Sequence, residues 1–358
     1  MSNYIEYADG VAFHPGYYIE ELIDDAGLTQ EEFAKRLDTT PKTLSLLVRG
    51  KQRLSVDIAA KLSRMLGTSI QYWLNLQSAF DATVAAHEGA AELDREREIF
   101  AYLEYKYFRI HFGLPDLPRQ KDAQMKAVRE FLGISSLTLL AKPDWAVRFR
   151  SATAHLSEGN IVKANVMVQI ALNQALATAT HKFNQDKFAQ AVDRALTLTT
   201  AQENFYDTLQ ADFREAGVSL VILPNIPGSK INGATVKIDG HVVLMVNDRR
   251  AAADTFWFTL FHEIGHIMNG DLGISFEGET GAQESKADAY AADKLIPQAD
   301  YETFVKQGSF TVQSITGFAQ QMDRDPGIVL GRLQCDGHVR YNDRSLNTLR
   351  RPYKAAKS

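Results

Sequence analysis

The sequence predicts a mainly helical (α+β) protein with a small β-sheet in its C-terminal half, and three observations support this. Residues 13–80 read as short helices separated by clear start and stop signals. Residues 84–216 also look helical and include an alanine-rich apolar stretch from Ala164 to Ala179. After Gly217 the pattern changes to β-branched runs, of which VSLVIL, residues 218–223, is the first.

The helix boundaries within residues 13–80 are marked by capping residues. Thr29 can cap a helix over residues 29–37, and Glu32 stands where it would complete a capping box. Pro41 follows Thr40 at the first position of another helix, which proline tolerates well. Ser55 and Ser69 are further N-cap candidates. Glycines stand where helices should stop: Gly27, Gly50 and Gly67.

The C-terminal half combines a hairpin with several helices. Two β-branched runs, 234–238 and 241–246, flank Asp239-Gly240, and an Asp-Gly pair between such runs is a strong hairpin signal. Helices are then expected over these ranges: 256–270, 283–295, 299–307 and 311–322. The tail from Arg340 onward is basic, and we expect it to be solvated and without function.

Composition limits the class of protein. The 358 residues have room for two or three domains, and 45% hydrophobic with 23% charged residues is ordinary for a globular protein. The formal net charge is −5, so contact with nucleic acid would need a local basic patch. The single cysteine, Cys335, fits a reducing cytoplasm. We read no signal peptide and no membrane span, and expect a cytoplasmic protein without a membrane partner.

The stretch FWFTLFHEIGHIMNGD, Phe256 to Asp271, carries the pattern H-E-x-x-H. On a helix, His262 and His266 share one face, so both imidazoles can bind one ion. Glu263 lies beside that face, where its carboxylate can accept a proton from a water at the metal. Two histidines and a glutamate among so many apolar side chains would be costly to bury without a partner, and Zn²⁺ would supply one.

A catalytic zinc site needs a third protein ligand and an open position for water. The next predicted helix offers Glu284 and Asp288, again four residues apart on one face. This spacing resembles the E-x-x-x-D arrangement of gluzincins, which implies that Glu284 binds the metal and that Asp288 holds a ligand histidine from behind. The alternative interpretation is a helix whose histidines line the edge of an apolar core, with Glu284 as a surface charge.

Residues from about 205 to 335 resemble the ImmA/IrrE family of metallopeptidases. The resemblance rests on Asn232-Gly233-Ala234, DTFWFTLFHEIGHIMNGD, ESKADAYAADKLIP and FAQQMDRDPGIVLGRLQ. It implies a compact zincin-like fold and cleavage of a repressor-type protein, often under stress control. It also implies that His262, His266 and Glu284 bind zinc and that Glu263 is the general base. Tyr290 stands where the family often has phenylalanine.

In zincins a sheet edge often holds the substrate as an added strand. We expect residues 242–246 to be that edge, and we expect the helical region 84–205 to cover the zinc cleft at rest. The oxyanion-stabilising residue is open, with His241 and Tyr341 as candidates.

Residues 13–80 closely resemble HigA-type antitoxins, which contain a helix-turn-helix of the Xre class. The resemblance implies five helices, a homodimer and binding to operator DNA. The recognition helix would begin at Pro41 and lie in the major groove. The predicted DNA-contacting residues are Thr40, Lys42, Thr43, Ser45, Arg49, Lys51 and Arg53. The first two helices are acidic instead, so the positive surface is local.

We therefore predict four parts: a helix-turn-helix domain over 1–82, a helical connecting region over 83–205, a zinc metallopeptidase domain over 206–335 and a basic tail over 336–358. The first hypothesis is a repressor of double-stranded operator DNA that carries a zinc endopeptidase. It would cleave a repressor-type protein, or itself, to relieve repression. The second is a non-proteolytic antitoxin whose zincin-like domain senses a ligand or binds a cognate toxin. The third is a peptidase that uses the helix-turn-helix to find a protein partner.

Overall fold

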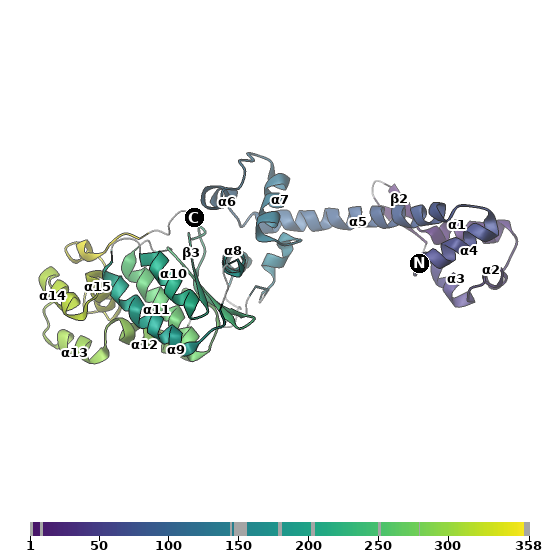
Figure 1. Cartoon of the computed structure of the whole chain (residues 1–358). Helices are drawn as coiled ribbons and strands as arrows, with labels where there is room; N and C mark the ends of the chain where they lie inside the picture. The colour runs from purple at the N-terminus through teal and green to yellow at the C-terminus, as the bar shows by residue number, and fades with distance from the viewer. Residues whose placement is uncertain are drawn as a thin grey trace. The chain divides into compact units, whose positions relative to one another are not determined.

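The computed structural model describes residues 3–7, 10–143, 145–146, 156–177, 181–201, 205–249, 252–278 and 280–353. It divides into two compact units, Met1–Arg95 and Glu96–Ser358, which are described separately. The predicted fold class is confirmed, because helices dominate and the sheets are small (Figure 1). The predicted domain bounds stay predictions.

The first unit holds a short hairpin and a five-helix array. The hairpin, β1 (Tyr4–Tyr7) and β2 (Gly10–Phe13), was not predicted. The helices are α1 (Pro15–Asp25), α2 (Gln30–Arg36), α3 (Pro41–Val48), α4 (Val56–Leu66) and α5 (Ile70–Phe100), which belongs to this unit as far as Arg95. Trp73 of α5 is buried in the core that these helices share, together with Phe33 and Leu44.

The predicted caps fix these helices in place. Thr29 accepts a hydrogen bond from the Glu32 amide, while the Glu32 carboxylate pairs with Arg36 instead of closing the capping box. Thr40 accepts from the Thr43 amide at 3.0 Å and so begins α3. Ser55 and Ser69 cap as expected. The glycines expected at helix ends have positive φ: Gly27, Gly50 and Gly67.

The second unit is built from a four-stranded sheet and helices on both sides of it. Its strands are β3 (Val218–Leu223), β4 (Ile231–Ile238), β5 (His241–Asn247) and β6 (Gly273–Phe276). The helices before the sheet are α6 (Tyr105–Phe112), α7 (Lys121–Leu132), α8 (Glu158–Leu176), α9 (Gln185–Thr197) and α10 (Phe205–Glu215). The later ones are α11 (Ala253–Asn269), α12 (Ala282–Leu295), α13 (Gln298–Lys306), α14 (Val312–Met322) and α15 (Pro326–Cys335).

The sheet has the strand order β3-β5-β4-β6, with β3 parallel to β5 and the other pairs antiparallel. The predicted hairpin at Asp239-Gly240 is confirmed, and both turn residues have positive φ. The expectation that residues 242–246 form a sheet edge is wrong, because β5 lies between two neighbours. The edge strands are β3 and β6.

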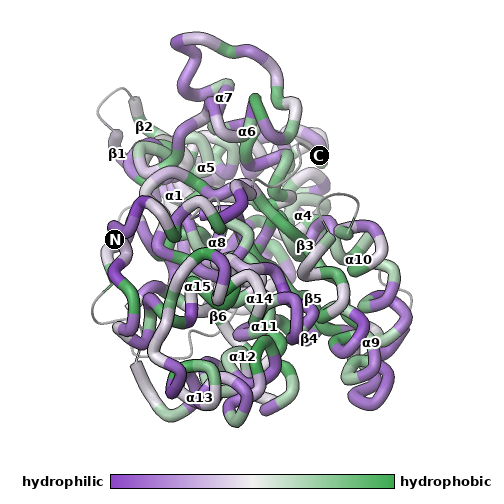
Figure 2. The backbone as a smooth tube through the Cα atoms, turned by 90° about the vertical axis from the view of Figure 1, so that its left-hand side faces the viewer, coloured by the Kyte–Doolittle hydropathy of each residue, from purple (hydrophilic) through white to green (hydrophobic). Residues whose placement is uncertain are grey.

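Strand β5 is buried along its whole length, because helices cover both faces of the sheet. Its alternate side chains Val242, Leu244 and Val246 join the apolar core that α11 also enters. Figure 1 shows α8 on the other side of the sheet from α11, and α8 contacts three of the strands. In Figure 2 strand β3 is largely green, in keeping with a strand that is hydrophobic and buried.

The C-terminal segment is not simply solvated, so that expectation is wrong for its described part. Arg350 pairs with the buried Asp254 at 3.2 Å, and Arg351 pairs with the buried Asp325 at 2.7 Å. The Tyr353 ring stacks on Phe256 with centroids 4.3 Å apart. These contacts tie the segment to the starts of α11 and α15. Lys354 and Lys357, which belonged to the predicted tail, lie outside the described residues.

Among the helices described, none is long and apolar enough to cross a membrane.

Candidate functional site

Helix α11 presents the H-E-x-x-H residues within an apolar surrounding. Its side chains at Phe261 and Ile264 are fully buried, and Glu263 and His266 are buried among them. Gly265 allows α12 to approach closely, since a Cβ added there would lie 3.1 Å from the Ala287 Cα and 3.2 Å from the Tyr290 ring. Tyr290 therefore packs against the back of α11. The close approach brings the α12 carboxylates beside the two histidines.

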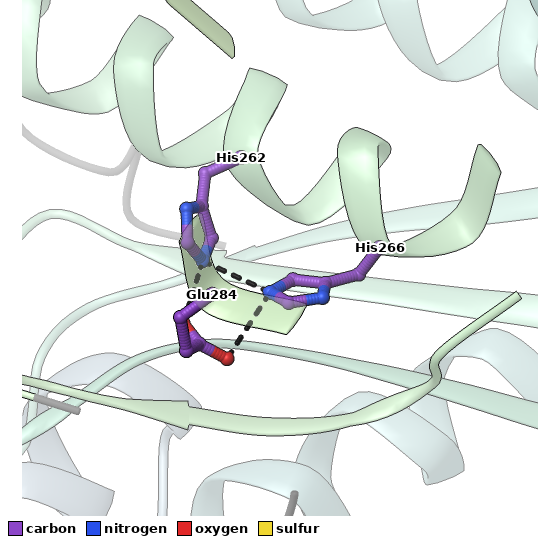
Figure 3. A group of neighbouring side chains, drawn as sticks. All are labelled: His262, His266 and Glu284. Carbon is purple, nitrogen blue, oxygen red and sulfur yellow. Dashed lines mark hydrogen bonds and ion pairs between the residues drawn. The ribbon is translucent and has the colours of Figure 1, made fainter. Parts of the chain in front are cut away.

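The side chains of His262, His266 and Glu284 converge on one point (Figure 3). The two Nε2 atoms are 3.0 Å apart. The Glu284 oxygens lie 3.1 Å from His262 Nε2 and 3.3 Å from His266 Nε2. The ligand atoms of all three side chains lie within 4.8 Å of one another, close enough to hold one metal ion. The structure thus brings together the three residues that the sequence singled out.

Each histidine is held from behind by a carboxylate. His262 Nδ1 lies 2.8 Å from Asp288 Oδ1, and His266 Nδ1 lies 3.1 Å from Asp271 Oδ1. A carboxylate only accepts, so each Nδ1 carries a proton and each ring turns its Nε2 atom toward the shared point. Lone pairs and carboxylate oxygens facing one another at this distance repel unless a cation lies between them. This donor set therefore fits a metal ion such as zinc.

The electrostatics of the site also favour a cation. The pKa of His262 is raised to about 10: burial, the largest single influence, opposes the charged form, but the hydrogen bonds to Asp288 and Glu284 outweigh it. Burial of Glu284 disfavours its charged carboxylate and by itself would raise the pKa. The hydrogen bonds to the two histidines nevertheless hold the pKa of this carboxyl well below its usual range. A negative field of this kind stabilises positive charge at the centre of the group.

Glu263 is fully buried beside this point, on the side where β4 passes. A Cβ added to Gly233 of β4 would lie only 2.6 Å from the Glu263 Cγ and Oε1 atoms. The absence of a side chain at residue 233 is what makes room for this carboxylate. Gly233 therefore sets the position of Glu263 relative to the two histidines.

A cleft of about 210 Å³ opens onto the group. Its described lining includes His262, Glu284 and Asp288, together with Asn232, Arg249 and Tyr353. All of its described lining residues come from position 232 onward, so the expectation that the region 84–205 covers the cleft is not supported within the described chain. Neither His241 nor Tyr341 is among the lining residues described. His241 is buried elsewhere, between Ser219 and the His181 carbonyl.

Sequence reasoning missed several residues of the site, among them Asp271 and Asn232. Asp271 stands five residues after His266, within the stretch Phe256 to Asp271. It lies beyond the end of α11, so helical periodicity could not place it beside His266. Asn232 was noted only for the family resemblance, and nothing in its neighbourhood placed it in a cleft.

In the first unit, the predicted DNA-contacting residues fall in two groups. Thr40, Lys42, Thr43 and Ser45 occupy the start of α3, where Lys42 is exposed. The Thr40 and Thr43 hydroxyl groups are hydrogen-bonded to each other, with their oxygens 2.8 Å apart. One of the two hydroxyls therefore already donates its proton within the protein. Arg49, Lys51 and Arg53 are exposed in and around the loop between α3 and α4.

These basic residues differ in how they are engaged. Arg53 pairs with Asp81 of α5, and the same helix anchors the loop through Gln77, which accepts from the Leu54 amide at 2.7 Å. Lys42, Arg49 and Lys51 take part in no ion pair within the described part of the chain. These three are thus the cations that remain available for phosphate or base contact.

Comparison with known proteins finds a family match within each unit. The helix-turn-helix family matches residues 19–73, and the IrrE N-terminal-like domain matches residues 215–315. The HTH-type transcriptional regulator YddM of Escherichia coli (strain K12) is 38% identical over 85 residues, which is 24% of this chain and 88% of that protein. The chain belongs to the HTH-type transcriptional regulators. It differs from YddM in being much longer, and the regulator carries an IrrE-like domain in the added part.

Antitoxin HigA-1 of Vibrio cholerae is 29% identical over 84 residues, covering 24% of this regulator and 79% of the antitoxin. Among solved structures, PA4674 of Pseudomonas aeruginosa in complex with its operator DNA is 27% identical. That match covers 24% of the regulator and 93% of PA4674, with a TM-score of 0.22. These similarities concern the helix-turn-helix unit of the regulator.

Proposed function

We propose that the regulator is an operator-binding repressor whose second unit is a zinc-dependent endopeptidase. In this proposal the peptidase cleaves a repressor-type protein, or the regulator itself, and so relieves repression. The helix-turn-helix unit binds double-stranded operator DNA as a homodimer.

One observation carries the peptidase proposal. Three acceptor side chains, His262, His266 and Glu284, converge on one point, and the buried Glu263 carboxylate stands beside it. A structural zinc site has four protein ligands and does not need a buried carboxylate beside them. Here three protein ligands converge, and two of them, His262 and Glu284, line a cleft through which water and substrate would reach the group.

The proposed reaction is hydrolysis of a peptide bond. A zinc ion held by His262, His266 and Glu284 would act as Lewis acid toward the carbonyl and lower the pKa of water. Glu263 accepts a proton from the attacking water while the water oxygen bonds to the carbonyl carbon. Glu263 then returns that proton to the amide nitrogen as the C–N bond breaks. Asp288 and Asp271 keep the two imidazoles in the tautomer that presents Nε2.

The DNA-binding proposal rests on α3 and on the relatives of the first unit. The exposed start of α3 carries Lys42, and Arg49 and Lys51 follow in the next loop. A recognition helix that enters the major groove contacts base edges through its N-terminal residues. The neighbouring lysine and arginine side chains can then neutralise phosphates on either side of the groove.

The variant Glu263→Gln tests the proposal because it removes the proton acceptor and keeps the shape of the side chain. The zinc-loaded full chain and the variant are compared for zinc content, for operator binding and for cleavage of a co-expressed repressor. The variant should keep zinc and DNA binding but leave the operon repressed under the stress that normally induces it.

If Glu263→Gln relieves repression as well as the wild type does, proteolysis is not the switch. The non-proteolytic antitoxin, in which the second unit senses a ligand or binds a toxin, would then replace the proposal.

A further inference from the structure

Asn232 occupies an irregular position at the edge of the cleft. Ile231 pairs with Phe276 of β6, and Gly233 pairs with Ser275, so that Asn232 is an extra residue between two adjacent pairs. Such a β-bulge bends a strand and re-aims a side chain, often beside an active site. Asn232 lines the same cleft as His262 and Glu284, and its neighbour Gly233 lies against Glu263.

Residues from other segments hold the bulge in this shape. Asn247, at the end of β5, donates to the Ile231 carbonyl at 2.9 Å and accepts from the Arg249 amide at 3.1 Å. The Arg249 guanidinium pairs with Glu277, directly after β6. It also donates to the Asn232 Oδ1 atom at 3.3 Å. Residues at the ends of β5 and β6, the two strands that flank β4, thus hold Asn232 in place.

The contact with Arg249 determines which way the Asn232 amide faces. A guanidinium has only donors, so the atom of Asn232 that meets it must be the carbonyl oxygen. The NH₂ group, with two N–H donors, therefore points away from Arg249. Because Asn232 lines the cleft, that group is available to an acceptor bound there.

We infer that the Asn232 side-chain amide donates a hydrogen bond to the substrate carbonyl oxygen as negative charge develops on it. This inference rests on the proposed peptidase function and adds a catalytic residue to it. During attack by water the carbonyl electron pair moves to oxygen, and a donor that is already oriented stabilises the oxyanion without reorganisation. Arg249 acts as a positioning residue, because it holds Asn232 by its oxygen.

The test uses the zinc-loaded full chain and fluorescein-labelled β-casein, an unfolded protein, as the probe. The variants are Asn232→Ala, which removes the donor, and Asn232→Asp, which keeps the shape but replaces the donor by an oxygen. Lys237→Ala, an exposed position on the same strand, is the matched control, and Glu263→Gln reports whether cleavage depends on the proposed base. Zinc content is measured for every variant.

Both Asn232 variants should keep zinc and lose about 10²–10³-fold in kcat with little change in KM, whereas Lys237→Ala should match the wild type. A wild-type kcat in Asn232→Asp, or loss of zinc together with activity, would overturn the inference and leave the peptidase function in place. Cleavage that is unaffected by Glu263→Gln, or absent in the wild type, would overturn the proposed function itself and the role of Asn232 with it.

Discussion

The packing of Gly233 against Glu263 gives a prediction whose first readout, the stability of the protein, needs no substrate. Replacing Gly233 by alanine places a Cβ 2.6 Å from the Glu263 Cγ and Oε1 atoms and 2.7 Å from Cδ. Carbon atoms in good contact are about 3.5–4.0 Å apart. The Glu263 side chain must therefore move by about 1 Å, although it has no exposed surface into which it could swing.

The expected cost has two parts. Overpacking a closely packed interior destabilises a protein by about 1–3 kcal/mol. Gly233 does not have the positive φ that disfavours alanine, so backbone strain does not add to this cost. In addition, a shift of about 1 Å in a catalytic group can lower kcat by about 10²-fold. We therefore expect Gly233→Ala to be less stable than the wild type and nearly inactive in casein cleavage.

The measurement is urea unfolding of the zinc-loaded full chain, followed by circular dichroism, with casein cleavage as the second readout. Gly317→Ala is the matched control. Gly317 lies exposed inside helix α14, and a Cβ added there would meet nothing within 4 Å. Alanine inside a helix is more stable than glycine by about 0.5–1 kcal/mol. The two glycine substitutions should thus change the unfolding free energy in opposite directions.

A Gly233→Ala variant that is as stable as Gly317→Ala would refute the claim that Gly233 makes room for Glu263. A variant that is destabilised but cleaves casein at the wild-type rate would show instead that the position of Glu263 does not control the reaction.

Three further substitutions test the metal site and the DNA-binding surface. Glu284→Ala should lower the zinc content below the expected value of about one per chain, and undiminished zinc in elemental analysis would exclude Glu284 as the third ligand. Asp271→Asn should weaken zinc affinity by about 10–100-fold in chelator competition, because His266 loses its carboxylate partner; equal affinity would mean that this contact does not tune the metal. Lys42→Ala should weaken specific operator binding more than nonspecific binding in gel-shift titrations, whereas Arg36→Ala, on the neighbouring helix, should not. An equal loss on every DNA sequence would indicate a simple charge patch.

Local interactions explain what could be predicted from the sequence. The Thr29 and Thr40 caps, the turn at Asp239-Gly240 and the pairs of ligands four residues apart each depend on a few consecutive residues. Their geometry follows from the helical or strand period alone. For the same reason the sequence could single out Glu284 and Asp288 once a helix was expected after the H-E-x-x-H motif.

Strand order, by contrast, depends on contacts between distant segments. Residues 242–246 have the composition of any buried strand. The local sequence does not show whether β5 has a neighbouring strand on one side, as an edge strand does, or on both sides. The basic C-terminal segment is a second case. Its arginines look solvated in sequence, yet Arg350 and Arg351 neutralise the buried Asp254 and Asp325. A buried carboxylate far away in the chain gives no local sign of the partner it needs.

The sequence by itself determined the caps of the helices within residues 13–80, the hairpin at Asp239-Gly240 and the identity of the side chains that could bind a metal. Only the tertiary structure decided that Asp271 supports His266, that Gly233 lies against Glu263, and that a bulge turns Asn232 into the cleft. The physical reason is that capping, turns and helical faces arise from neighbours along the chain. The position of a side chain within a cleft arises instead from how the sheet and helices of the second unit pack together.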